Sequence, residues 1–218
     1  MTKYSELALS AEIQQAVEKM GFTQLTEVQE KAIPVLLEGK EVIAKAPTGT
    51  GKTCAFGIPI IERINPESNK PQAVILAPTR ELAQQIAEEL TELAHFLPKV
   101  RIVCVYGGAN IQRQAEKLKK GCQIVVATPG RLMDHMHHKN IDVSGVTSIV
   151  LDEADEMLNM GFYKDVRRII DSMKARKSLC MFSATISREV MDIGWLYQRD
   201  AEEISVQPVL ESQPKIHQ

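Results

Sequence analysis

The segment best suited to chemistry consists of Ala46, Pro47, Thr48, Gly49, Thr50, Gly51, Lys52 and Thr53. Gly49 and Gly51 can adopt backbone conformations that turn successive amides toward one anion. Lys52 can reach the β- and γ-phosphates of a nucleotide, and the Thr53 hydroxyl can ligate Mg²⁺. The segment follows an apolar run and opens a helical pattern, which is the context that a phosphate-binding loop requires. Although alanine stands where the pattern usually has its first glycine, the sequence predicts a nucleoside triphosphate site rather than an unliganded turn.

A second group, Asp152-Glu153-Ala154-Asp155, follows the apolar run Ser148–Leu151. Asp152 is predicted to hold Mg²⁺ through water, and Glu153 to orient or deprotonate an attacking water. Acidic residues at this position could also merely complement the N-terminus of a helix. A phosphate loop in the same chain favours the catalytic interpretation.

Alternating strand and helix patterns must position these groups. The predicted strands are Val42–Ala44, Ala73–Ala77, Ile102–Tyr106, Ile124–Ala127, Ile149–Leu151 and Leu179–Phe182. The predicted helices are Ala11–Met20, Glu27–Leu37, Thr53–Ile64, Glu81–His95, Ile111–Lys119, Leu132–His138, Tyr163–Met173 and Arg188–Tyr197. This pattern predicts an α/β fold with a mostly parallel sheet and helices on both faces. Ligands of such sheets bind beyond the carboxyl ends of the strands.

Composition narrows the class of protein. The chain has 218 residues, 44% of them hydrophobic, and a net charge of −2, which excludes a globally basic nucleic-acid-binding protein. Local basic contacts with phosphates remain compatible with this charge. The four cysteines form no Cys-x-x-Cys pair, and no apolar run reaches membrane-spanning length. We therefore predict a cytoplasmic protein that makes no contact with membranes.

The acidic cluster Asp152–Asp155 is also the point at which the sequence resembles the DEAD-box ATP-dependent RNA helicases. The motifs that carry the resemblance occur in the family's order: 46–53, Pro78–Ala83, Gly107-Gly108, Thr128–Arg131, 152–155 and Ser183–Thr185. The resemblance covers nearly the whole chain and corresponds to the first of the family's two RecA-like domains. It implies a three-layer RecA-like domain over residues 41–206, with residues 1–40 belonging to the same domain. Residues 207–218 would form the interdomain linker.

The resemblance also assigns an adenine-reading segment, the family's Q motif, near the N-terminus. Gln29 would bond the edges of adenine, because an amide donates and accepts together, and Phe22 would stack on its face. From the residues alone, Thr26 and Gln29 fit a helix capping box equally well, and both roles can coexist for Thr26. The family commonly has proline before and after this threonine, whereas here Leu25 and Glu27 occupy those places. ATP is the nucleotide that this assignment implies.

RNA is the second ligand that the resemblance implies. Where strands end, threonine, proline and arginine begin helices, which on local grounds indicates ordinary helix caps. The same positions offer free amides and arginines to phosphates. The residues assigned to RNA are Pro78, Thr79, Arg80, Gly108, Thr128, Gly130 and Arg131. Contacts limited to phosphate and sugar would give little sequence preference.

Ser183 and Thr185 are predicted to couple the nucleotide to the RNA surface. Their hydroxyls could bond Asp152 or Asp155, although a simple turn-forming Ser/Thr pair is the alternative. Two further expectations concern structure. The histidine cluster His135, His137 and His138 is expected on a solvated helix rather than around a metal, and Trp195 is expected in the core.

The family's arginine finger lies in a second RecA-like domain, and no His-Arg-x-Gly-Arg-x-x-Arg segment occurs here. The resemblance therefore implies a monomeric half enzyme that binds nucleotide but hydrolyses it very weakly. Two alternatives remain open. A kinase or GTPase is one, although Asn69-Lys70-Pro71-Gln72 lacks the aspartate that would read guanine. A non-catalytic RNA-binding scaffold is the other.

Overall fold

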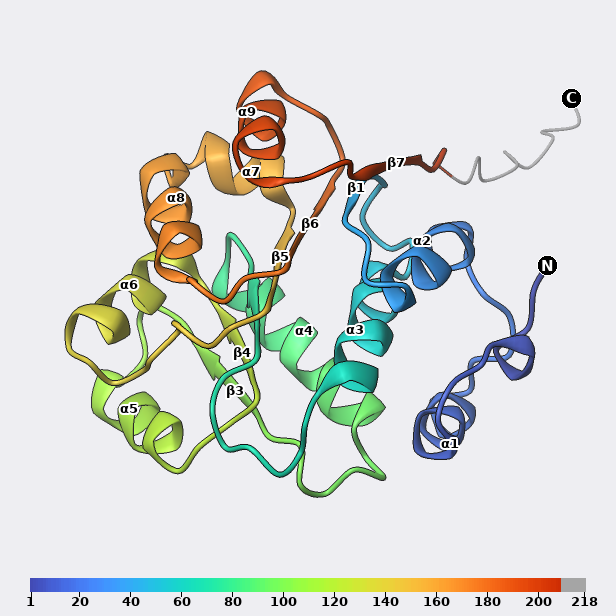
Figure 1. Ribbon diagram of the computed structural model, residues 1–218, viewed down its shortest axis with the longest axis horizontal. Helices are drawn as coiled ribbons and strands as arrows, with labels where there is room; N and C mark the ends of the chain where they lie inside the picture. The colour runs from blue at the N-terminus through green and yellow to red at the C-terminus, as the bar shows by residue number, and fades with distance from the viewer. Residues whose placement is uncertain (209–218) are drawn as a thin grey trace, which may run out of the picture.

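A seven-stranded sheet forms the centre of the computed structural model, which describes residues 1–208 (Figure 1). The strands are β1 (Val42–Lys45), β2 (Ala73–Leu76), β3 (Ile102–Val105), β4 (Ile124–Ala127), β5 (Ser148–Asp152), β6 (Ser178–Ser183) and β7 (Glu202–Ser205). Their order is β3-β4-β2-β5-β6-β1-β7, and every pairing between neighbours is parallel. The predicted parallel sheet is therefore confirmed. The predicted linker 207–218 lies almost wholly outside the described residues.

Helices occupy most of the connections between strands. They are the short 3-10 helix η1 (Tyr4–Glu6) and the α-helices α1 (Ala11–Lys19), α2 (Glu27–Leu37), α3 (Lys52–Arg63), α4 (Arg80–Leu93), α5 (Ile111–Lys119), α6 (Pro129–His137), α7 (Ala154–Asn159), α8 (Tyr163–Ser172) and α9 (Arg188–Tyr197). Across residues 1–208, no helix combines the length and apolar character that crossing a membrane requires.

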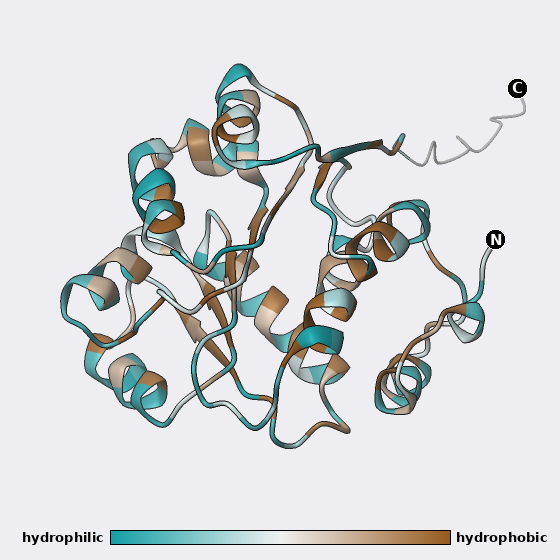
Figure 2. Ribbon diagram, viewed as in Figure 1, coloured by the Kyte–Doolittle hydropathy of each residue, from teal (hydrophilic) through white to brown (hydrophobic). Residues whose placement is uncertain are grey.

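The helices form one layer on each face of the sheet. Helices α1 to α4 lie on one side in Figure 1, and α5 to α9 lie on the other. Strand β2 shows why two cores form, because successive strand residues point to opposite faces. Ala73 and Ile75 join the core under α1 to α4, whereas Val74 and Leu76 join the other core. The apolar strands between two polar-faced helical layers are visible in Figure 2.

Side-chain caps begin several of the helices. Thr79 Oγ1 accepts a hydrogen bond from Leu82 N at 3.2 Å at the start of α4, which satisfies one of the free amides of its first turn. Thr128 occupies the same position before α6, with a proline next to it, but its side chain makes no capping bond. The Thr128 hydroxyl is therefore not used by the helix that it precedes.

Three features differ from the sequence-based expectations. Strand β7 was not predicted, because only Ile204 of its residues is buried and two of the others are glutamates. Helix α7 is a short helix directly after the acidic cluster and was also not predicted. The expectation that Trp195 lies in the core is wrong, since this side chain is 73% exposed on α9.

Candidate active site

Six strands end in the segments that the sequence marks as functional, and parallel pairing brings all six ends to one edge of the sheet. The order of the strands then sorts these segments into two groups. Neighbouring strands β3, β4 and β2 carry the segments predicted to bind RNA. Their neighbours β5, β6 and β1 carry the acidic cluster, the coupling residues and the phosphate loop. A nucleotide site and an RNA surface would therefore lie side by side.

The phosphate loop connects β1 to α3, and its shape depends on glycine. Gly49 and Gly51 both have a φ of +82°, a region that other residues enter only at a cost of roughly 1 kcal/mol or more. At Gly51 a Cβ would also lie 2.4 Å from Gln29 Nε2, so a side chain there would have to displace the Gln29 amide. Thr50 Oγ1 donates to Pro47 O at 2.7 Å and closes the turn. Thr48 is exposed at its tip.

Lys52 and Asp152 form a buried pair at the centre of this edge. Lys52 Nζ lies 3.4 Å from Asp152 Oδ1, and the two side chains are only 7% and 3% exposed. This ion pair leaves Nζ without a hydrogen bond, which is costly for a buried ammonium group. Burial raises the pKa of Asp152, and the charge of Lys52 opposes that shift. The buried ammonium group of Lys52 lacks a hydrogen bond and lies beside the phosphate loop, which is suited to binding an anion. The site therefore fits a phosphate ligand.

Glu153 has a strained backbone next to this pair. Its φ of 50° and ψ of 51° are left-handed, which costs an L-residue roughly 1–2 kcal/mol. Asp152 Oδ1 accepts a hydrogen bond from Glu153 N at 3.0 Å and holds this conformation. Burial and the charge of Asp152 raise the pKa of Glu153. A half-buried carboxyl with a raised pKa and a strained backbone is typical of a functional position.

Thr53 follows the lysine at the start of α3 and is nearly buried. Glu89 on the next helix, α4, lies near it. Burial raises the pKa of Glu89, and the hydroxyl of Thr53 partly offsets that shift. Sequence reasoning missed Glu89, because a glutamate in the middle of an amphipathic helix carries no signal of its own. Asp152 and Thr53 supply the oxygen ligands that Mg²⁺ prefers, so the side chains present fit that ion.

Gln29 uses most of its amide within the protein. Its Oε1 accepts hydrogen bonds from Thr26 N at 3.0 Å and from the Tyr4 hydroxyl. Its Nε2 donates to Gly51 O at 3.0 Å. The capping box is therefore present, and the same side chain links the start of α2 to the phosphate loop. One Nε2 hydrogen remains for a base, and the adenine contact stays a prediction.

Phe22 lies beside this network. It is 42% exposed, and its ring stacks on that of Tyr4 with centroids 6.4 Å apart. Tyr4 also donates a hydrogen bond to Gln29, so direct contacts link Phe22, Tyr4 and Gln29. An exposed ring face at this position is suited to a planar ligand.

Two of the residues predicted to bind RNA lie together at the ends of β2 and β3. The exposed Arg80 guanidinium lies 4.8 Å from the centroid of the Tyr106 ring, a cation–π contact that holds it in place. Gly108 has a φ of +82°, and a Cβ on it would lie 3.8 Å from Arg80 Nη1. Pro78 is buried, and the Thr79 hydroxyl accepts from the backbone of α4. Arg80 and the loop that contains Gly107 and Gly108 (the glycine loop) thus remain open to a ligand.

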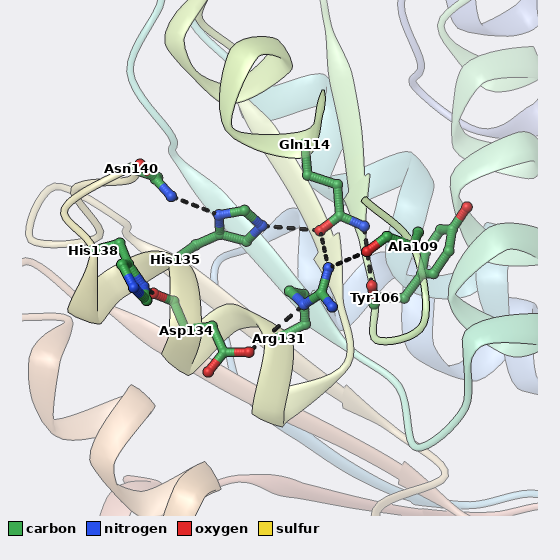
Figure 3. A network of polar contacts seen from close by, with 8 residues as sticks. All are labelled: Tyr106, Ala109, Gln114, Arg131, Asp134, His135, His138 and Asn140. Carbon is green, nitrogen blue, oxygen red and sulfur yellow. Dashed lines mark hydrogen bonds and ion pairs between the residues drawn. The ribbon is translucent and has the colours of Figure 1, made fainter. Parts of the chain in front are cut away.

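Arg131 is largely occupied by internal contacts (Figure 3). Its Nη1 donates to Ala109 O at 2.9 Å and to Gln114 Oε1 at 3.1 Å. Its Nε lies 3.6 Å from Asp134 Oδ2, and the side chain is 13% exposed. Arg131 therefore holds the loop that contains Gly108 against α6. Thr128 and Gly130, nearby, are half-exposed.

Gln114 contacts Arg131 directly, and His135 contacts Gln114. Gln114 Nε2 donates to Tyr106 O at 3.0 Å, so its Oε1 faces both Arg131 and His135 Nε2, the latter at 2.9 Å. His135 Nε2 therefore carries the ring proton, and Nδ1 accepts from Asn140 Nδ2 at 3.1 Å. The expectation that His135 lies on a solvated helix face is wrong, because it is fully buried. A single polar residue in a helical pattern cannot reveal such a partner in advance.

This buried ring predicts a pH dependence of stability. Burial lowers the pKa of His135 below 6.5, and the charge of Arg131 acts in the same direction. The unfolded chain therefore binds the proton more readily, so the contribution of the neutral ring is present above pH 6.5 and is lost as the pH falls through the folded pKa. Urea unfolding should show a larger loss of stability from about pH 7.5 to about pH 5 in the unchanged protein than in His135→Gln.

The matched control is His137→Gln, because His137 is exposed on the same helix. That variant should retain the pH dependence of the unchanged protein. Parallel stability curves for the unchanged protein and His135→Gln would contradict the assignment of the neutral ring.

The coupling residues contact Asp155 rather than Asp152. Thr185 Oγ1 donates to Asp155 Oδ2 at 2.7 Å, and Asp155 N donates to Ser183 Oγ at 3.0 Å. Burial raises the pKa of Asp155, but the hydrogen bonds of Thr185 and Ser183 outweigh it, so the net shift is downward. The ends of β5 and β6 are therefore joined directly, two residues away from the strained Glu153.

Comparisons with known proteins identify similar sequences and a matching family. The family model described as DEAD/DEAH box helicase matches residues 26–193. The ATP-dependent RNA helicase CshA of Listeria monocytogenes is 48% identical over 206 residues, which is 94% of this chain and 39% of that protein. The DEAD-box ATP-dependent RNA helicase CshA of Geobacillus kaustophilus is 43% identical over 218 residues, which is 46% of its length. The chain thus spans less than half of these relatives.

Solved structures show the same likeness. The crystal structure of a DEAD box protein from the hyperthermophile Methanococcus jannaschii matches with a TM-score of 0.87 and 40% identity, covering 95% of this chain and 56% of that one. A hypothetical ATP-dependent RNA helicase from Sulfolobus tokodaii matches with a TM-score of 0.83 and 37% identity, covering 91% and 57%. Both matches extend across both layers of helices and the sheet between them.

Proposed function

Because this chain belongs to the DEAD/DEAH box helicase family, we propose that it is the ATP-binding RecA-like domain of an ATP-dependent RNA helicase. The observation that carries the proposal is the buried pair Lys52–Asp152, whose Nζ lacks a hydrogen bond. This pair lies between the phosphate loop, whose turn depends on Gly49 and Gly51, and the strained Glu153. A phosphate would satisfy the ammonium group and allow the pair to separate.

Each residue has a distinct role in the proposed hydrolysis. Lys52 and the amides of the phosphate loop bind the β- and γ-phosphates. Thr53 and Asp152 would hold Mg²⁺, which when bound neutralises charge on the phosphates. Glu153 orients the attacking water and accepts its proton, for which a raised pKa suits a general base near neutral pH.

RNA is proposed to bind across the ends of β3, β4 and β2. Arg80 supplies an exposed, oriented cation, and half-exposed Thr128 and Gly130 offer groups at the start of α6. Contacts of this kind address phosphates and sugars, which accounts for binding by a chain whose net charge is −2. Arg131 acts here by holding the glycine loop, and its own contact with RNA remains a prediction.

A second RecA-like domain is proposed to complete the active site. Without its arginine, hydrolysis would lack charge stabilisation worth on the order of 10³-fold or more in rate. We also propose a cytoplasmic, reducing location. The four cysteines are free, and burial raises the pKa of Cys54 and Cys180 to about 12, so these thiols stay protonated and inert.

Base recognition provides the test of the nucleotide assignment. ATP should displace a fluorescent ATP analogue from this chain at lower concentration than GTP, and Gln29→Ala should bring the two competition curves together. The ratio of the two affinities is the decisive measurement, because loss of the bond from Gln29 to Gly51 would weaken both nucleotides alike. Gln24→Ala, an exposed neighbour in the same segment, is the matched control and should keep the preference. Equal affinity for ATP and GTP in the unchanged protein would contradict the proposal.

A further inference from the structure

A groove lies between α9 and the edge strand β7, apart from the residues assigned to nucleotide and RNA. Its volume is about 660 Å³, and it is lined by Met191, Gly194 and Trp195 of α9 and by Gln198, the residue that ends this helix. These residues follow a spacing of three and four, so they form one stripe along the helix. Trp195 is 73% exposed and Met191 is 38% exposed. Large apolar side chains gathered at a groove indicate a surface that binds a partner.

The opposite wall of the groove is a strand with an open edge. In the sheet, β7 pairs only with β1 among the described strands and is the last in the order. Glu202 N and Val206 N donate to carbonyls of the β1 segment. Because a ladder alternates, the main-chain groups of Glu203 and Ser205 face away from β1. Exposed Lys31 of α2 donates from Nζ to Ser205 O at 3.1 Å. An extended segment that displaces this side chain could pair with β7, as in other cases of strand addition.

The charged residues around the groove indicate which kind of partner it would bind. Asp200 and Glu203 line it, with Lys45 as the one basic residue of the lining. The carboxylates of Asp200 and Glu203 form an acidic rim, and exposed Glu202, next to Glu203, lies 3.9 Å from Lys40 Nζ. A second copy of β7 would bring glutamates against glutamates, which disfavours self-pairing. RNA phosphates would be repelled as well, although an indole can stack on a base.

We propose that the groove between α9 and β7 binds an extended basic peptide segment of another protein. The segment adds a strand to β7, places a bulky apolar side chain against Trp195, and sets its basic residues against the acidic rim. This surface lies outside the proposed catalytic site, so it would serve recruitment rather than hydrolysis.

Intrinsic fluorescence tests this proposal directly, because Trp195 is the single tryptophan of the chain. The probe is the peptide Lys-Arg-Leu-Val-Leu-Arg-Lys, and the control peptide is Glu-Asp-Leu-Val-Leu-Asp-Glu. Burial of the indole should shift its emission to the blue and protect it from quenching with the basic peptide only. Saturation by both peptides, or by neither, would overturn the proposal. A blue shift on raising the protein concentration alone would instead identify a self-interface and overturn it too.

Three variants locate the contact by polarisation of the labelled basic peptide. Trp195→Gln should weaken binding by about tenfold or more, as expected for a central aromatic anchor. Glu203→Lys should weaken peptide binding because it reverses one charge of the acidic rim. Ser205→Pro should weaken binding by removing an outward amide without disturbing the pairing with β1. Phe96→Gln, an exposed aromatic residue on the other helical layer, should leave it unchanged.

Nucleotide affinity separates this proposal from the proposed function. Trp195→Gln should bind ATP as the unchanged protein does, whatever the outcome for the peptide. Unchanged peptide affinity in Trp195→Gln would refute the groove as the binding site. A blue shift produced by an RNA oligonucleotide but not by the peptide would refute the choice of partner.

Discussion

Replacement of Lys52 by alanine is expected to weaken ATP binding by about 100-fold or more. A charge-assisted hydrogen bond is worth about 1.5–3 kcal/mol, and Lys52 is positioned to contact two phosphates. The variant also leaves the buried Asp152 without its cation, so the pKa of that carboxyl should rise further. Equilibrium titration of a fluorescent ATP analogue into the 218-residue chain measures the effect.

The control for this variant is Lys45→Ala, because Lys45 is an exposed lysine at the end of the strand that precedes the phosphate loop. It should bind ATP normally. Urea unfolding should show that Lys52→Ala remains folded, since removal of an unsatisfied ammonium offsets part of the cost of the unpaired carboxylate. An affinity within about twofold of the unchanged protein would contradict the role of Lys52.

Replacement of Glu153 by glutamine is expected to abolish hydrolysis while leaving ATP binding intact. Proton transfer by a positioned side chain contributes roughly 10²–10⁴-fold to a rate, and glutamine keeps the shape of the residue without its basicity. Stability should be equal or slightly higher, because the half-buried carboxyl lies beside the charge of Asp152, which raises its pKa. RNA-stimulated phosphate release should be measured with the second RecA-like domain supplied.

Glu156→Gln is the matched control, since Glu156 is exposed on the first turn of the same short helix, α7. Its rate should equal that of the unchanged protein. Normal hydrolysis by Glu153→Gln would mean that the strained carboxyl has no part in the reaction.

The fold was predictable where burial on both faces of a strand leaves an unbroken apolar run. Ile124–Ala127 has the predicted bounds, and the other predicted strands differ by one residue at one or both ends. Strand β7 was missed because an edge strand needs only one apolar face, and Ile204 alone carries it. Trp195 was misplaced for a related reason: a helical pattern gives the face of a residue but not whether another layer covers that face.

The sequence by itself determined which residue types stand at the ends of the strands. Gly49, Gly51 and Lys52 indicate phosphate whatever the rest of the fold, because their chemistry depends on local backbone geometry and one charge. The acidic cluster after β5 carries a similar local signal. Parallel strands then require these groups to lie at one edge of the sheet.

Tertiary structure alone decided which of these groups meet. The order β3-β4-β2-β5-β6-β1 puts the phosphate loop and the acidic cluster on one side of the predicted RNA segments, although these segments lie between the two along the chain. Gln29 donates a hydrogen bond to Gly51 O, and Arg131 donates one to Ala109 O in the glycine loop. Both bonds join residues that are far apart in sequence. Hydrogen bonds and ion pairs act over a few ångströms, so only the packed arrangement determines whether a polar side chain is free for a ligand or already satisfied within the protein.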